Sequence, residues 1–274
     1  MTASTKVDPR SEKRAQLLSQ LGQQVETLKA SEGWLAWLET AAKFHRYSVG
    51  NQLMILSQRP DATRVAGFQT WKSLGRQVRK GEKGLAIFAP MSVRKVDDET
   101  GEEKRSLFFK VVHVFDASQT DGEELPELTW PVLADGSEGL ADELVSVAEG
   151  LGFSVTLTTT SPSGARGWFD PRERRITIVD TYPMGSRART MLHELAHALD
   201  SLEGGRAECE LVAESAAFIV GKRLGLDTDD CSTFYTASWS CGPRKLEAIA
   251  ERVLDIARRL ESVVRPEAGE EVAA

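Results

Sequence analysis

The amino-acid sequence predicts an α+β protein built of two domains. Apolar residues recur at helical spacing through the first 58 residues, and a stretch rich in β-forming residues follows up to residue 115. The second half places a helix and several short strands before two further helices. With 274 residues, the chain has the length of one large domain or two small ones.

Three helices are expected at the start of the chain. Leucines and a valine at helical spacing indicate a first helix over residues 11–30, and the tryptophan-containing segment 33–44 indicates a second. Residues 47–56 are the third helical candidate, and a short helix is predicted for residues 69–74.

The pattern then changes to strands and turns. Three glycines interrupt the basic loop 75–84, and residues 85–93 and 106–115 are rich in β-forming residues. The polar run 97–101 between them predicts a hairpin turn. Residues 117–137 are acidic and contain two prolines, which is typical of a linker between domains.

The second half alternates helical and extended patterns. Its first predicted helix covers residues 140–151, and a last amphipathic helix covers residues 246–260, after an irregular segment at 231–242. Strands are predicted at 153–158, 167–170 and 175–179. The predicted organisation is therefore a helical extension at 1–30, a first domain at 31–119, a linker at 120–137, a second domain at 138–265 and a disordered tail at 266–274.

The run His193-Glu-Leu-Ala-His197 has the H-E-x-x-H pattern. Two histidines four residues apart lie on one face of a helix and can bind the same metal ion, while Glu194 can take a proton from an attacking water. The flanking leucines repeat at intervals of three and four residues, so a helix with a buried stripe is expected here. We therefore predict one catalytic zinc ion and a hydrolase.

A third ligand is needed, because catalytic zinc usually takes three protein ligands. No histidine follows His197, so a carboxylate or a cysteine must serve. Glu210 and Glu214 lie one turn apart in a segment of small and apolar residues, where buried carboxylates need a compensating cation. We assign Glu210 as the third ligand and Glu214 as the hydrogen-bond partner of a ligating histidine. The rival ligands are Glu203, Glu208 and Cys209.

Composition and charge limit the class of protein. The first 90 residues carry 14 Lys/Arg against 7 Asp/Glu, and the rest carries 20 against 34. A basic module that meets a polyanion would explain this split, as would a basic half that complements the acidic half. The absence of an apolar leader or a long apolar run, together with three cysteines without C-x-x-C spacing, leads us to expect a cytoplasmic protein without membrane contact.

The basic loop and its neighbours suggest a nucleic-acid surface. Cations follow a phosphate backbone, and aromatic faces stack on unpaired bases, so single-stranded DNA fits better than a duplex. The alternative is that the aromatic residues pack in a core and the charges form a solvated loop. The candidate binding residues are Tyr47, Asn51, Trp71, Lys72, Arg76, Arg79, Lys80 and Lys83.

Several segments resemble a known family. The stretches 44–58, 65–71, 75–84 and 114–119 are similar to the N-terminal single-stranded-DNA-binding domain of ArdC-type antirestriction proteins and their LtrC-like relatives. The H-E-x-x-H run followed by Glu210-Leu-Val-Ala-Glu214 resembles the ImmA/IrrE-type metallopeptidase domain that accompanies it. Departures are Val49, where ArdC proper tends to have glycine, and a short segment between His197 and Glu210.

The resemblance implies a zincin-like (gluzincin) metallopeptidase domain at 138–265 and a single-stranded-DNA-binding domain at 31–119. It assigns metal ligation to His193, His197 and Glu210 and the general base to Glu194. Tyr235 lies in a run that also fits the family, and we hypothesise that its phenol stabilises an oxyanion.

The expected function is an antirestriction or DNA-transfer accessory protein of a mobile element, acting on single-stranded DNA and on a protein substrate of unknown identity. The alternatives are a non-catalytic single-stranded-DNA-binding antirestriction factor with structural zinc, and a regulatory peptidase that cleaves a repressor.

Overall fold

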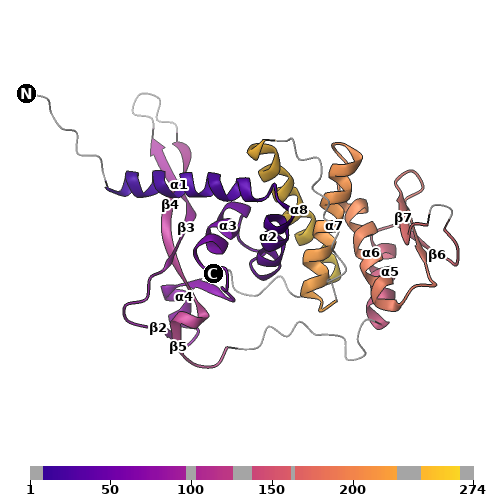
Figure 1. Ribbon diagram of the computed structural model, residues 1–274, viewed down its shortest axis with the longest axis horizontal. Coiled ribbons are helices and arrows are strands. Elements are labelled where there is room, and N and C mark those ends of the chain that lie inside the picture. Colours follow the sequence, from indigo (N-terminus) through magenta and orange to yellow (C-terminus); the bar gives the residue numbers. More distant parts are fainter. Residues whose placement is uncertain (1–8, 97–102, 126–137, 162–163, 227–241, 266–274) are drawn as a thin grey trace, which may run out of the picture. The chain divides into compact units, whose positions relative to one another are not determined.

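The computed structural model describes residues 9–96, 103–125, 138–161, 164–226 and 242–265 (Figure 1). They form two compact units. The first unit contains the chain up to Thr27 together with residues 50–125, and the second contains residues 28–49 together with the chain from residue 138 onward. The fold mixes helices and strands in both units, as the α+β prediction requires.

The first unit is built on an antiparallel sheet of order β1-β4-β3. A second, two-stranded sheet pairs β2 with β5. The elements are α1 (Pro9–Thr27), α3 (Val49–Gln58), β1 (Val65–Gly67), α4 (Phe68–Ser73), β2 (Arg76–Val78), β3 (Leu85–Val96), β4 (Glu103–Asp116), the 3-10 turn η1 (Ala117–Gln119) and β5 (Thr120–Gly122).

Two amide side chains of α3 cover the free edge of β3. Asn51 donates to the Phe88 carbonyl (2.8 Å) and accepts from the Phe88 N–H (2.9 Å). Gln58, two turns further along α3, makes the same pair of bonds with Ala86, at 2.9 Å each. An uncovered strand edge would leave its backbone groups unpaired, so these two amides close the sheet where no further strand follows.

Buried Asp116 joins β4 to the chain before β1. Its carboxylate accepts from the backbone N–H groups of Thr63 (2.8 Å), Arg64 (3.1 Å) and Ser118 (3.0 Å). Burial would raise the pKa of Asp116, but hydrogen bonds from the Ser118 hydroxyl and from these backbone N–H groups outweigh it and hold the pKa below its ordinary value.

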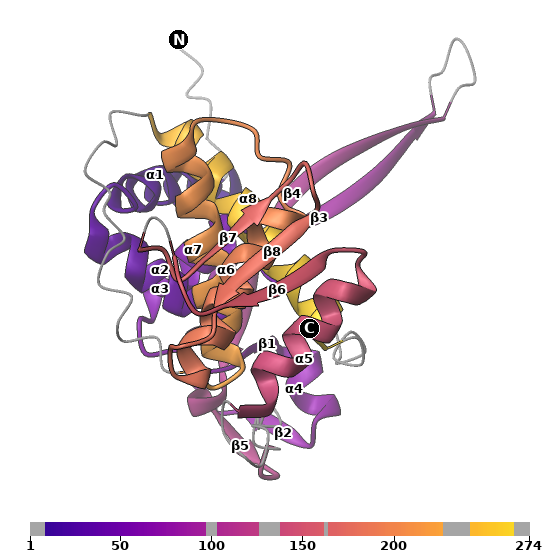
Figure 2. The ribbon, with the colours of Figure 1, turned by 90° about the vertical axis from the view of Figure 1, so that its right-hand side faces the viewer.

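The second unit combines a three-stranded sheet with five helices among its described residues. The sheet has the order β6-β8-β7, with β6 parallel and β7 antiparallel to β8 (Figure 2). Helix α6 packs against α5, α7, α8 and the sheet. The elements are α2 (Ser31–Lys43), α5 (Glu138–Gly150), β6 (Ser154–Thr158), β7 (Gly167–Asp170), β8 (Arg175–Val179), α6 (Met184–Leu199), α7 (Arg206–Arg223) and α8 (Pro243–Val264).

Helix α2 packs in the second unit, although its sequence lies in the range predicted for the first domain. Trp34 and Trp37 are fully buried, with ring centroids 4.8 Å apart, and the Trp34 indole N–H donates to Ser215 Oγ on α7 (3.0 Å). Small residues of α7, such as Ala213 and Ala216, are buried with them. Two large rings therefore associate with the helix that offers room for them.

The predicted elements correspond closely to those observed, apart from three short strands. Val65–Gly67 form β1, which was not predicted, and Arg76–Val78 form β2 within the predicted basic loop. Thr120–Gly122 lie within the predicted linker but form β5, which pairs with β2. The predicted hairpin turn at 97–101, the irregular segment apart from Gly242 and the tail at 266–274 lie outside the described residues. No helix within the described ranges is long and apolar enough to cross a membrane.

Candidate metal centre

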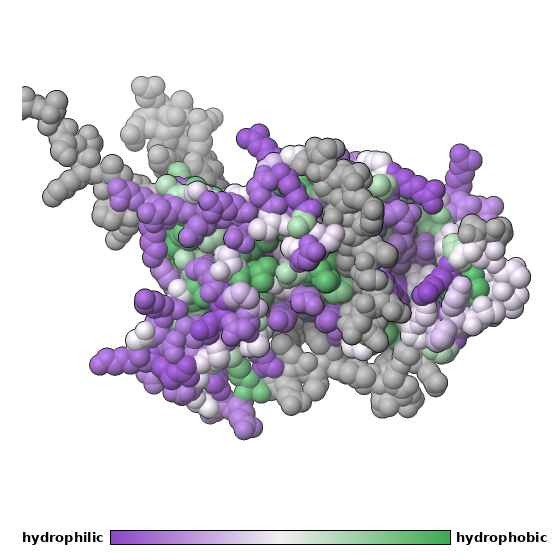
Figure 3. All heavy atoms as spheres, viewed as in Figure 1, coloured by the Kyte–Doolittle hydropathy of each residue, from purple (hydrophilic) through white to green (hydrophobic). Residues whose placement is uncertain are grey.

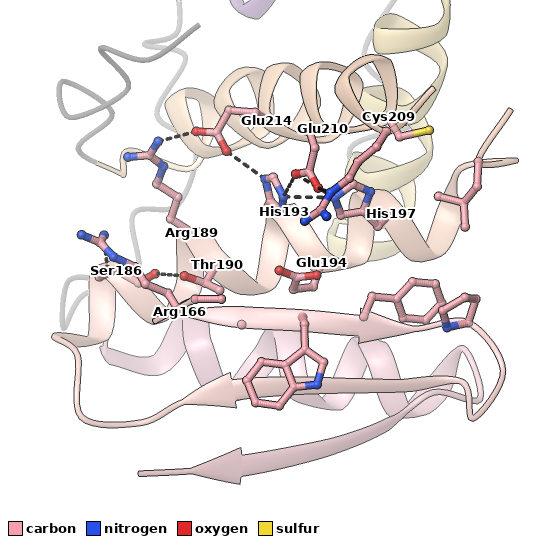
Figure 4. Close-up of a pocket in the computed structure, with 17 residues that line it drawn as sticks. Arg166, Ser186, Arg189, Thr190, His193, Glu194, His197, Cys209, Glu210 and Glu214 are labelled. Carbon is pink, nitrogen blue, oxygen red and sulfur yellow. Dashed lines mark hydrogen bonds and ion pairs between the residues drawn. The ribbon is translucent and has the colours of Figure 1, made fainter. Parts of the chain in front are cut away.

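The two histidines of the H-E-x-x-H run lie on α6, between its buried face and an open cavity. Leu192, Leu195 and Ala196 are fully buried beneath the helix and hold its orientation. His193 and His197 stand one turn apart and point toward α7, where Glu210 faces them (Figure 4). The spacing of four residues thus brings both imidazoles to one point.

The three candidate ligand atoms form a compact triangle. The Nε2 atoms of His193 and His197 are 3.1 Å apart, and they lie 3.4 Å and 3.5 Å from Glu210 Oε2. A tetrahedral zinc ion with bonds of about 2.0–2.1 Å would place its ligand atoms about 3.3–3.4 Å apart. Two imidazole nitrogens and one carboxylate oxygen also suit this ion chemically, so these residues fit a divalent metal.

Glu214 contacts His193 at Nδ1, the ring nitrogen that is not part of the ligand triangle. Its Oε2 lies 2.8 Å from His193 Nδ1, and its other oxygen accepts from Arg189 (Figure 4). Burial would lower the pKa of His193, but the hydrogen bonds with Glu210 and Glu214 raise that pKa to about 10. Burial would also raise the pKa of Glu214, whereas His193 and Arg189 lower it to about 2. The carboxylates therefore create a strongly negative site that favours a cation.

Glu194 follows His193 on α6 and points toward β7, where it lines the same cavity as the two histidines (Figure 4). It is buried, and the backbone N–H of Phe169 on β7 donates a hydrogen bond to it. Burial raises the pKa of this carboxyl above its ordinary value. A carboxylate whose pKa is raised toward neutrality is a better proton acceptor and donor for catalysis at that pH.

A cavity of about 910 Å³ opens beside these groups. Helices α6 and α7 form one wall, and β7 forms another with Trp168 and Phe169. Gly167 allows β7 to approach α6, because a Cβ atom there would lie 2.6 Å from Thr190 Cγ2 and 2.9 Å from the Thr177 carbonyl oxygen. The space is large enough for a peptide segment or a small ligand.

The surroundings of Glu210, the candidate third ligand, differ from the prediction in one respect. The side chain of Glu210 is 47% exposed, so the expected pair of buried carboxylates is not observed. The reason is that α7 presents this edge to the open cavity. The rival ligands serve elsewhere: Glu208 pairs with Lys245, and the thiol of buried Cys209 lies 3.7 Å from the carbonyl of Glu203. Tyr235 lies outside the described residues.

The predicted DNA-binding residues fall into two groups in the structure. Trp71 is only 2% exposed and its indole N–H donates to the Phe115 carbonyl, so its ring offers no free face. The side chains of Asn51, Arg76 and Arg79 bind neighbouring parts of the first unit. Tyr47 is half-buried in the second unit, where its carbonyl accepts from Arg258.

Of the predicted set, Arg79 is exposed but binds Glu82 and Asp121, and Lys72, Lys80 and Lys83 are the exposed lysines. They belong to α4 and to the loop between β2 and β3, where hydrophilic side chains cover the surface (Figure 3). Phe68, which was not among the predicted contacts, lies one turn before Lys72 and is 47% exposed. Its position beside the basic loop is the signal that could have identified it.

Residues 10–115 match the family model for the N-terminal domain of the anti-restriction factor ArdC. The N-terminal part of the chain therefore carries an ArdC-type N-terminal domain. The fold also agrees with that of ArdC over most of the chain. The metal-free crystal structure of the antirestriction protein ArdC from plasmid R388 covers 90% of this chain and 98% of its own, with a TM-score of 0.62 and 23% identity.

A second crystal structure of the R388 ArdC protein is Mn(II)-bound. It covers 82% of this chain and 86% of its own, with a TM-score of 0.51 and 22% identity. At these identities, the two ArdC structures establish a shared fold.

Curated relatives of this ArdC-type chain are longer proteins. An uncharacterized protein of Bacillus anthracis is 28% identical over 252 residues, which cover 75% of this chain and 43% of that protein. A DNA primase TraC of Escherichia coli is 28% identical over 240 residues, covering 78% of this chain and 16% of the primase. An uncharacterized protein of Sinorhizobium fredii is 26% identical over 196 residues, covering 63% of this chain and 61% of that protein. The chain thus spans less than two thirds of each of these relatives.

Proposed function

We propose that this protein binds single-stranded DNA through its first unit and carries a zinc-dependent metallopeptidase site in its second. In the cell it would act as an antirestriction or DNA-transfer accessory protein of a mobile element. The observation that carries the enzymatic part is the triangle of His193, His197 and Glu210 beside the buried carboxyl of Glu194, in one open cavity. A similar fold with Mn(II) bound, in the R388 protein, supports metal binding.

The residues would divide the chemistry as follows. His193, His197 and Glu210 would hold the ion, which supplies a Lewis acid when bound. Glu194 would take a proton from the attacking water and return it to the leaving amine, a role that suits a carboxyl with a raised pKa. Glu214 would keep the His193 ring oriented through the bond to Nδ1. Zinc is our choice because the donors are two nitrogens and one oxygen.

One variant separates a peptidase from a binding protein. Glu194→Gln keeps the shape of the side chain and all three ligands but removes the proton acceptor. We expect one zinc per chain by elemental analysis in wild type and in Glu194→Gln, and loss of zinc in His197→Ala.

The biological measurement is survival of conjugated plasmid DNA in a recipient with an active restriction enzyme. The peptidase proposal requires Glu194→Gln to behave like a deletion. If this variant retains its zinc and still protects DNA fully, the protein acts as a non-catalytic DNA-binding factor with a structural ion.

For the DNA-binding part, the exposed lysines beside Phe68 carry the proposal. Each cation that neutralises a phosphate of a single strand contributes about 0.7 to the slope of log K against log salt. Lys80→Ala with Lys83→Ala should therefore flatten the slope by about 1.4, measured by fluorescence anisotropy with labelled oligo(dT). The control removes two exposed cations of the second unit, Arg172 and Lys222, and should leave the slope unchanged. Equal slopes in wild type and in the Lys80/Lys83 variant would refute this contact surface.

A further inference from the structure

The metal centre depends on the short loop that joins its two helices. His193 and His197 lie on α6, which ends at Leu199, and Glu210 lies on α7, which begins at Arg206. The six-residue loop 200–205 therefore sets the distance between the histidine pair and the third ligand. In this loop Leu202 has φ 55°, a left-handed backbone conformation that is unfavourable for a non-glycine residue. A loop with such a cost needs external support to keep one conformation.

Arg252 of α8 supplies that support. Its Nε and Nη2 donate to the two carboxylate oxygens of Asp200, at 2.8 Å and 2.5 Å. Its Nη1 donates to the Glu203 carbonyl (2.5 Å) and lies 3.5 Å from Glu208 Oε1, and Nη2 also lies 3.8 Å from Cys209 Sγ. A guanidinium has five N–H donors, and all five are directed at the loop or at the first turn of α7.

The ion pair between Arg252 and Asp200 is well shielded from water. The side chain of Asp200 is 2% exposed and that of Arg252 is 18% exposed. A two-pronged, charge-assisted pair in such surroundings fixes orientation as well as distance. Lys245, also on α8, binds the second oxygen of Glu208 at 3.0 Å, so the same helix holds the start of α7 at two points.

Few contacts hold the side chain of Glu210 in place. Its carboxylate is 47% exposed, and apart from the two histidines its nearest charged partner is Arg206, 3.7 Å away on the same helix and itself 94% exposed. An ion pair within α7 cannot fix α7 relative to α6. The position of Glu210 therefore follows from the backbone around Glu208 and Cys209, the region that Arg252 contacts. Because metal–ligand distances tolerate only about ±0.2 Å, a small shift of this turn would weaken the site.

We propose that Arg252 is a positioning residue of the metal centre, which holds loop 200–205 so that Glu210 meets His193 and His197 at ligand distance. This inference rests on the proposed metal site and on none of the proposed peptidase chemistry. Arg252 itself touches no ligand atom; it acts through Asp200 on the α6 side and through Glu208 and Cys209 on the α7 side.

The test measures metal binding by the full-length chain in the absence of any substrate. Apo protein is titrated with Co(II), whose visible absorption reports coordination, and zinc affinity is measured by competition with a chromophoric chelator. The variants are Arg252→Met, which removes all five donors, and Arg252→Lys, which keeps the charge but not the planar fork. The matched control is Arg258→Met, because Arg258 lies on the same helix and also donates to two loop carbonyls, those of His45 and Tyr47, away from the metal ligands.

We expect Arg252→Met to lose about 10- to 100-fold in metal affinity and to show an altered Co(II) spectrum, the range seen when residues behind metal ligands are removed. Arg252→Lys should fall between Arg252→Met and wild type, and Arg258→Met should bind as wild type does. Should Arg252→Met fail to fold, the affinity and spectrum of Arg252→Lys decide the question alone.

Wild-type affinity and spectrum in the folded Arg252 variants would overturn the positioning role while leaving the metal site intact. A wild-type protein that binds neither Co(II) nor zinc would overturn the metal site itself, and the positioning role with it.

Discussion

Acid should destabilise the second unit through one half-buried histidine, His45. Arg223 donates from Nη1 to His45 Nδ1 at 2.5 Å, and a guanidinium can only donate, so this nitrogen must carry a lone pair. Protonation of His45 would place an N–H against that guanidinium. Burial first, and then the charges of Arg223, Arg46 and Arg258, lower the pKa of His45 from 6.5 to about 3.

The sign and size of the effect follow from proton linkage. Between pH 6.5 and 3 the unfolded chain binds a proton at residue 45 that the folded chain does not, so the free energy of unfolding falls as the pH falls. From pH 7 to pH 5, with an unfolded pKa of 6.5, the loss is about 1.9 kcal/mol. This figure changes little as long as the folded pKa stays below about 4, because the folded state then remains neutral at pH 5.

The assay compares urea unfolding of metal-free wild type and His45→Asn at pH 7 and pH 5. The asparagine amide oxygen can replace Nδ1 as the acceptor from Arg223 but does not titrate. Fluorescence of the buried pair Trp34 and Trp37 reports on the same unit. Wild type should lose about 1.9 kcal/mol more than His45→Asn between the two pH values. Equal losses in the two proteins would refute the argument that His45 stays neutral in the folded chain.

Three further outcomes are expected. Asp116→Asn should destabilise the first unit by about 2–3 kcal/mol in urea unfolding, because buried backbone donors lose an acceptor, whereas exposed Asp121→Asn should change little. Since the pKa of Asp116 is lowered, its contribution to stability is present at neutral pH and is lost as the pH falls through the folded pKa. Zinc at 100 times its dissociation constant should stabilise wild type by about 2.7 kcal/mol in a thermal melt, and His197→Ala should gain nothing comparable. Asn51→Leu should uncover the Phe88 backbone groups on β3 and cost about 1–3 kcal/mol, with faster amide exchange at Phe88 as the specific readout.

Local patterns predicted the elements well because helical spacing and β-rich runs are properties of adjacent residues. The pair of histidines on α6 is such a pattern, since four residues along a helix always bring side chains to one face. The placement of α2 is not a local property. Trp34 and Trp37 could have packed against either half, and contacts with α7, among them the hydrogen bond from Trp34 to Ser215, place them in the second unit. The strand β5 escaped prediction for the same reason: its three residues acquire their structure from β2.

In the candidate DNA surface, burial decides whether a side chain suited to binding DNA is available to do so. Trp71 and Asn51 have side chains suited to stacking and hydrogen bonding with bases, yet both are used within the fold, one under β4 and one along the edge of β3. Phe68 and the exposed lysines lie in the same short stretch of sequence as Trp71, Arg76 and Arg79, and the sequence alone does not show which of these side chains are exposed. Exposure is set by contacts between distant segments, so single-sequence patterns cannot rank such candidates.

The shape of the short connection between His197 and Glu210 also depends on a residue that is distant in the sequence. Asp200 stands where some zinc hydrolases have a glycine turn, and it ends α6 in an extended conformation instead. A loop without that glycine has to obtain its shape from elsewhere, and in this chain Asp200 itself provides the attachment, by binding Arg252 with both oxygens. In the sequence, Arg252 belongs to the polar face of an amphipathic helix, and no motif around it indicates a functional role. Its role emerges only once the loop is folded, because its partners lie more than forty residues away, on both sides of the connection between the ligands.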